Sequence, residues 1–161
     1  MKLYHYLLIV GFILEGIITN FIPIQTKLFN PLLLFVTIVF VYPYFKNDKK
    51  YYKTCLIYGI IYDLIYTNTL IFHGILFLLI GYIVHYLYKL FSLNIINITI
   101  IVIGCIVIYR ILGYLLVCLV SSYNFSWFTL LNSITSSLIL NVIYISFLYI
   151  IINKKYHYFK V

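Results

Sequence analysis

Long apolar runs separated by short polar stretches fill this chain of 161 residues. A helix needs about 20 apolar residues to cross a bilayer, and most of the runs approach or exceed that length. The third run is short and is followed at once by Asn68 and Thr69, so it ends in a tight hairpin or is partly re-entrant. The pattern predicts an all-α bundle of about six transmembrane helices, forming one integral membrane domain over residues 1–161. The predicted spans are 3–24, 31–45, 54–67, 70–91, 95–120 and 127–152.

The composition indicates that lipid is the solvent for most of the outer surface. Hydrophobic residues make up 65% of the chain and charged residues only 9%, whereas a soluble domain has about 25% charged residues. So few charges cannot cover a soluble globule. The net charge of +8 does not indicate nucleic-acid binding, because the positive residues lie at the ends of apolar runs and not in a recognition motif.

The positive residues also predict an orientation, because cytoplasmic loops of membrane proteins carry an excess of Lys and Arg. With the amino terminus inside, only Lys27 lies on the outer side. We therefore expect a multi-pass membrane protein with both termini in the cytoplasm. The lysines on the inner side would be Lys2, Lys46, Lys49, Lys50, Lys53, Lys89, Lys154, Lys155 and Lys160.

Three ionisable residues, Glu15, Asp63 and Arg110, fall inside the apolar runs. Each costs at least about 2.5–3.5 kcal/mol at the centre of a membrane helix, so such residues usually face the bundle interior or a wet cavity. We expect Arg110 to pair with one of the two acids. The other acid would be held by hydroxyls or amides, or would be protonated. A structural role and a functional role both remain open for Asp63.

Glycines at helical spacing predict close helix contacts. Gly59 and Asp63 are four residues apart and share a helix face, as do Gly74 and Gly81, which are seven apart. Small residues allow backbones to approach closely in lipid. We therefore interpret these positions as packing surfaces first.

Catalytic and metal-binding motifs are missing from the sequence. It contains no HExxH, GxSxG or phosphate-binding loop, and His73 and His85 are not spaced as a metal pair. The three cysteines lie in apolar runs and are expected to be buried hydrophobes. The sequence predicts no enzyme, no cofactor and no metal.

The segment 58–67, with Gly59 and Asp63, is followed by Leu70 and Gly74. This pattern resembles the signature of the MreD family, the rod-shape-determining membrane proteins of bacteria. Residues 15–19 resemble the first-helix segment of Gram-positive members, and residues 130–132 resemble the start of their last helix. Arg110 lies outside the pattern.

The resemblance implies a non-catalytic component of the cell-elongation machinery, embedded in membrane lipid. Its partner would be an MreC-like single-span membrane protein, through which MreB filaments are coupled to peptidoglycan synthases. The resemblance also implies a fold similar to the substrate-binding subunits of energy-coupling-factor transporters. The alternative function is a transporter subunit for a small vitamin-type molecule, with Glu15, Asp63 and Arg110 lining a cavity. The candidates for an intramembrane polar core or partner contact are Glu15, Gly59, Asp63, Gly74 and Arg110.

Overall fold

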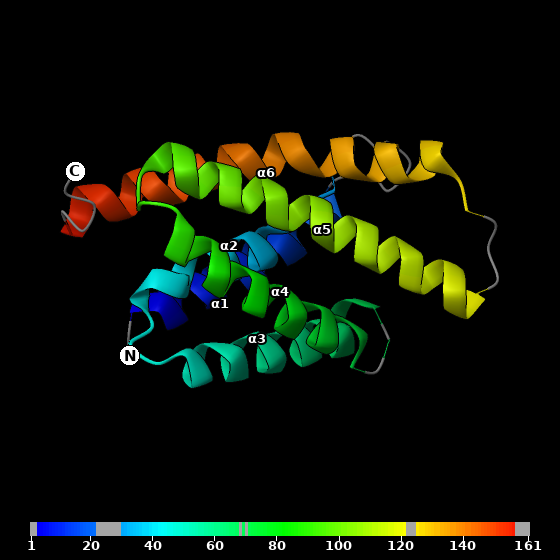
Figure 1. The fold of residues 1–161 in the computed structure, drawn as a ribbon, viewed down its shortest axis with the longest axis horizontal. Helices are drawn as coiled ribbons and strands as arrows, with labels where there is room; N and C mark the ends of the chain where they lie inside the picture. Colours follow the sequence, from blue (N-terminus) through cyan, green and yellow to red (C-terminus); the bar gives the residue numbers. More distant parts are fainter. Residues whose placement is uncertain (1–2, 22–29, 68, 70, 122–124, 157–161) are drawn as a thin grey trace.

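The computed structural model describes residues 3–21, 30–67, 69, 71–121 and 125–156. These residues form six α-helices and two short helical segments of other types, with no strand among them (Figure 1). The α-helices are α1 (Leu3–Phe21), α2 (Leu33–Val41), α3 (Asp48–Tyr62), α4 (Phe72–Leu90), α5 (Ile95–Ser121) and α6 (Trp127–Tyr156). A 3-10 turn, η2 (Tyr42–Tyr44), extends α2, and a π-helical turn, η3 (Asp63–Thr67), ends α3. The prediction of an all-α polytopic bundle is confirmed.

Four helices of the described chain, α1, α4, α5 and α6, are long and apolar enough to cross a membrane. The expected spans 31–45 and 54–67 correspond to the shorter α2 and the more polar α3. Helix α3 starts at Asp48, before the expected span, because the Asn47 side chain caps it by accepting from the Lys49 N–H at 2.9 Å. The number of crossings remains a prediction.

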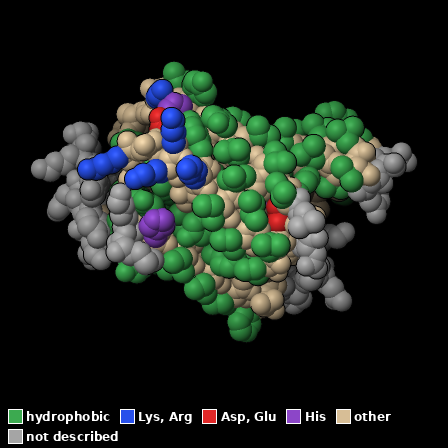
Figure 2. All heavy atoms as spheres, turned by 90° about the horizontal axis from the view of Figure 1, so that it is seen from below, with side chains coloured by type: hydrophobic (Ala, Val, Ile, Leu, Met, Phe, Trp, Pro, Cys, Tyr) green, Lys and Arg blue, Asp and Glu red, His purple; other side chains and the backbone are tan. Residues whose placement is uncertain are grey.

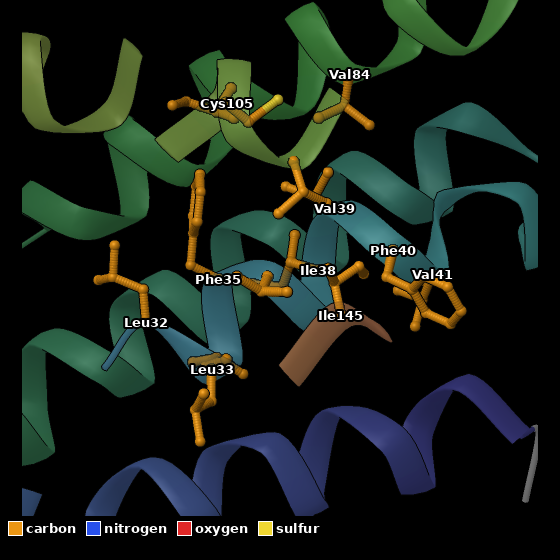
Figure 3. Packing of buried hydrophobic residues seen from close by; sticks show 14 of the residues in the cluster. Leu32, Leu33, Phe35, Ile38, Val39, Phe40, Val41, Val84, Cys105 and Ile145 are labelled. Carbon is orange, nitrogen blue, oxygen red and sulfur yellow. The ribbon is translucent and has the colours of Figure 1, made fainter. Parts of the chain in front are cut away.

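Helix α2 lies at the centre of the bundle, and all nine of its residues are buried. A helix that is apolar on every side belongs in a core, and α2 packs against α1, α4, α5 and α6. Figure 3 shows its side chains among Val84 of α4, Cys105 of α5 and Ile145 of α6. The ring of Phe35 lies 4.7 Å from the ring of Tyr109, centroid to centroid. The shortest α-helix therefore forms the centre of the core, and four longer helices pack around it.

Helices α3 and α4 form an antiparallel hairpin, side by side along their length (Figure 1). Their polar ends meet, where the rings of Tyr52 and Tyr82 stack at 4.3 Å between centroids. Close to this end, the Tyr42 hydroxyl of η2 donates to Oδ1 of Asp48 at 3.1 Å. The same hydroxyl is hydrogen-bonded to Nδ1 of His85 at 2.7 Å. The polar contacts at this end of the hairpin therefore join α3, α4 and η2.

The lysines of the described chain gather at this same polar end of the bundle. Figure 2 shows them on one side of an otherwise largely apolar face, and they include Lys46, Lys49, Lys50 and Lys53, all exposed. The start of α1 and the end of α6 lie at this end too (Figure 1). Lys2, Lys27 and Lys160 fall outside the described residues, as do the side chains of Lys154 and Lys155, and the side of the membrane that this end faces stays a prediction.

Candidate functional site

Glu15 caps the buried amino terminus of α2. Its Oε2 accepts from the Leu34 N–H at 2.8 Å, and its Oε1 accepts from the Tyr62 hydroxyl at 2.9 Å. Glu15 is only 1% exposed. The first N–H groups of a helix have no partner within it, and the helix dipole favours a negative group there. One carboxyl group from α1 therefore joins α2 to α3.

Asn141 of α6 completes the cap of α2. Its Oδ1 accepts from the Leu32 N–H at 3.1 Å, while its Nδ2 donates to the carbonyls of Ser137 and Asn30, at 2.5 and 3.3 Å. The preceding backbone, residues 30–32, is not helical. Non-helical backbone at membrane depth needs partners from the protein itself. Asn141 and the Ser136 carbonyl supply them for Asn30 and Leu32, and Glu15 serves the first turn of α2 that follows.

Asp63 caps α4 in the same way, from the end of the preceding helix. Its Oδ2 accepts from the backbone N–H groups of His73 and Gly74, at 2.8 and 3.3 Å. Its Oδ1 accepts from the hydroxyls of Thr69 and Thr67, at 2.6 and 3.1 Å, and contacts Nδ1 of His73 at 2.6 Å. The acid therefore joins the end of α3 to Thr69 and to the start of α4.

Gly59 and Gly74 mark the point where α3 and α4 come closest. A Cβ built on Gly59 would lie 2.6 Å from the Gly74 Cα and 2.7 Å from the His73 carbonyl oxygen. Those neighbours are backbone atoms that cannot rotate away. Only glycine fits at position 59 without separating the helices, and the close approach brings the start of α4 within reach of Asp63.

Arg110 does not form the expected ion pair with an acid. Its Nε donates to the Ser137 hydroxyl at 2.7 Å, and its buried Nη2 has no hydrogen-bond partner within the described chain. Both candidate acids are already engaged, Glu15 by α2 and Asp63 by α4. The prediction of a contact pair was therefore wrong, because it did not anticipate that helix ends compete for the acids.

Arg110 lines a cavity of about 450 Å³ between α4, α5 and α6. Neither Glu15 nor Asp63 is among its lining residues in the described chain. The transporter alternative requires all three charges to line one cavity, and the structure does not bring them together. Among the described residues, no three His, Cys, Asp or Glu side chains are grouped so that they could hold a metal ion.

The sequence analysis did not include several residues of this polar network among its candidate site residues, notably Tyr62, Thr69, His73 and Asn141. Helix capping could have indicated Thr69 and His73, because they follow Asp63 closely and lie next to the start of the next helix. Tyr62 and Asn141 gave no such signal. Their partners lie 47 and 109 residues away in the sequence, and Tyr and Asn are abundant throughout this chain.

The fold and the site define a class: a polytopic membrane helix bundle whose intramembrane acids hold its own helix ends. The chain matches the family model for the rod shape-determining protein MreD over residues 1–159. It belongs to the MreD family of bacterial membrane proteins. A role in determining rod shape is what this membership implies, and the family is one of shape-determining membrane proteins, not a known family of enzymes. Searches of curated proteins and of solved structures each found no match.

Proposed function

We propose that the protein is a non-catalytic membrane scaffold of the cell-elongation machinery. It would bind an MreC-like single-span protein and so help couple MreB filaments to peptidoglycan synthases. The match to the MreD family supports a role in this machinery. The observation that supports a scaffold is the use of both intramembrane acids: Glu15 and Asp63 are at most 1% exposed and cap helices of the bundle. Neither is free to bind a substrate or an ion.

Burial limits what the candidate residues can do for a partner. Glu15, Gly59, Asp63 and Gly74 are all buried, so they would act on a partner only by holding the helices that contact it. Their burial fits the predicted polar-core role. A direct contact with a partner would need exposed side chains, so we do not propose one at these four positions. A partner helix must bind elsewhere on the lipid-facing surface.

We place that contact in the groove between α1 and α3, which measures about 410 Å³. Ile9 and Phe12 of α1 line one side at helical spacing, and Ile57 and Ile61 of α3 line the other. Ile9 and Ile57 are 40% and 53% exposed. The Tyr66 hydroxyl of η3 donates to the Phe12 carbonyl at 2.9 Å and so links α1 to the end of α3. Two parallel apolar ridges suit a single partner helix, which binds through such spaced anchors.

The test is co-purification of the tagged protein from its native membrane in a mild detergent. We expect recovery of a single-span protein with a large extracytoplasmic domain. Recovery of ATPase subunits without such a protein would contradict the proposal. Ile57→Trp should fill the groove and reduce recovery of the partner at least about tenfold, the effect of about 1.4 kcal/mol.

The matched control is Ile139→Trp on the outer face of α6, where Ile139 is 59% exposed. It should leave partner recovery unchanged. If Ile57→Trp also leaves recovery unchanged, the partner binds outside this groove and the scaffold proposal stands without it.

The proposed topology is one membrane domain, residues 1–161, with six crossings and both termini in the cytoplasm. Single cysteines at positions 48 and 157 should be shielded in intact cells, and a cysteine at position 124 should be labelled from outside. Positions 124 and 157 lie outside the described residues. Labelling of position 157 from outside would contradict an even number of crossings.

A further inference from the structure

The cavity beside Arg110 has an apolar side and a polar side. Leu76 of α4 and Leu116, Val117 and Val120 of α5 form the apolar side. Val117 and Val120 are 43% and 82% exposed, so this side is open at the outer surface of α5. His73, Arg110, Tyr114 and Ser133 bring polar groups to the same space. A volume of about 450 Å³ lies within the range of about 300–1,000 Å³ that is usual for ligand sites.

Arg110 is the one side chain with a permanent charge among the described residues that line the cavity. Its guanidinium has five N–H donors, of which the Nε–H is bonded to Ser137, while the buried Nη2 has no partner. No ion pair between Arg110 and an acid is formed in the described chain. A cation held in a bundle without an anion is costly, and a bound anion would offset that cost.

Two further polar groups at the cavity differ in what they can offer an anion. The Tyr114 hydroxyl accepts from the Ser126 N–H at 2.9 Å, which leaves its own proton free to donate. The Ser133 hydroxyl donates to the Leu130 carbonyl at 2.8 Å, so its proton is already used. His73 contacts Asp63 through Nδ1. Arg110 and Tyr114 therefore each have an N–H or O–H group that can donate to a ligand.

We propose that this cavity binds an anionic amphiphile, with a phosphate at Arg110 and Tyr114 and a hydrocarbon part along the apolar side of α5. The planar guanidinium matches phosphate oxygens. The open apolar side favours a phospholipid of the membrane over a free phosphate ion, which would leave that side unfilled. The cavity lies at the start of α4, away from the lysine-rich end, so the predicted orientation places the lipid in the outer leaflet.

The test is thermal unfolding of the purified protein in a neutral detergent with added short-chain phosphatidylglycerol. At about a hundred times its dissociation constant, we expect the lipid to raise the unfolding midpoint by about 5–10 °C. Phosphatidylcholine with the same chains should have a much smaller effect, and so should inorganic phosphate. Arg110→Gln should abolish the rise, whereas Lys89→Gln removes a positive charge outside the cavity and should keep it.

A second pair of variants tests the apolar side without touching the charge. A Cβ on Gly113 would meet only Leu76, at 3.9 Å, so Gly113→Leu can fill the cavity. Gly104, on the same helix, has nothing within 4 Å, and Gly104→Leu is the control. We expect Gly113→Leu alone of the two to abolish the rise, even if Arg110→Gln does not fold.

Three results would overturn the proposal. Phosphatidylcholine could stabilise the protein as strongly as phosphatidylglycerol, which would remove the role of the anion. Inorganic phosphate could give the full effect, which would remove the role of the hydrocarbon. The rise could also persist unchanged in folded Arg110→Gln or in Gly113→Leu, which would place the lipid outside this cavity.

Discussion

The amino termini of α2 and α4 are capped by the same chemistry in different surroundings. In each case a carboxylate from a preceding helix accepts from the N–H of the second helical residue, Leu34 or His73, at 2.8 Å. Glu15 reaches a helix whose residues are all buried. Asp63 closes a turn whose Thr67 and Thr69 hydroxyls pair with each other in an exposed position. The first cap lies inside the core, and the second lies near the surface.

The two caps also differ in how far apart their partners lie in the sequence. The partners of Asp63 are 4 to 11 residues away. Glu15 joins segments 19 and 47 residues away, and the same helix end also binds Asn141 of α6. The cap at α4 therefore stabilises one hairpin, whereas the cap at α2 stabilises the packing of four helices. This difference leads us to expect the larger loss when Glu15 is removed.

The largest effect is expected for Glu15→Leu. It leaves the Leu34 N–H and the Tyr62 hydroxyl buried without a partner, at a cost of about 1–3 kcal/mol each. The unfolding midpoint in detergent and the amount of protein in the membrane should both fall. Glu15→Gln is the control, because its amide oxygen can still accept from Leu34 and its NH₂ can donate to Tyr62. If both variants lowered the unfolding midpoint equally, the charge of Glu15 would matter more than its hydrogen bonds to α2 and Tyr62.

A smaller loss is expected for Asp63→Leu, by about 1–3 kcal/mol in total. The variant loses the acceptor for the N–H groups of His73 and Gly74, but the turn lies near exposed hydroxyls that can partly replace it. Asp63→Asn should retain most of the stability. The comparison between the two caps would fail if Asp63→Leu lowered the unfolding midpoint further than Glu15→Leu.

Gly59→Ala tests the close helix contact that holds the second cap in place. The new Cβ would meet backbone atoms of α4 at 2.6–2.8 Å, and relieving such a clash typically costs about 1–3 kcal/mol. Gly104→Ala, on open surface of α5, should be neutral or slightly stabilising because alanine favours helix. Equal unfolding midpoints for the two variants would mean that α3 and α4 are not packed this closely.

The smallest effect is expected at Ile71, which precedes α4 with a φ of 67°. A β-branched side chain is disfavoured in the left-handed region, so Ile71→Gly should stabilise the protein by about 0.5–1 kcal/mol. Ile75 is equally exposed, at 51%, but lies inside α4. Ile75→Gly should destabilise by about as much. A lower midpoint for Ile71→Gly would argue against the strained turn beside Asp63.

The sequence predicted the parts of this fold that depend on local patterns. The apolar runs predicted the helices. The short third run, followed at once by Asn68 and Thr69, indicated a tight hairpin or a partly re-entrant segment, and the glycine spacing indicated close helix contacts. The sequence did not predict the central position of α2, because an apolar run has the same pattern whether lipid or protein surrounds it. Nor did it predict the partners of Glu15, since an acceptor for a helix end is identified only once distant segments are packed. The expected pair with Arg110 was wrong for the same reason.

The most direct test of the central claim is the double variant Glu15→Gln/Asp63→Asn in a rod-shaped bacterium that lacks its own MreD-family protein. Both amides retain an acceptor for the helix ends and remove the charge. If the acids act as caps, the variant should accumulate normally, recover its single-span partner on co-purification and restore rod-shaped cells. A variant that accumulates normally but leaves the cells round would contradict the claim, because ionisation of the acids would then be essential.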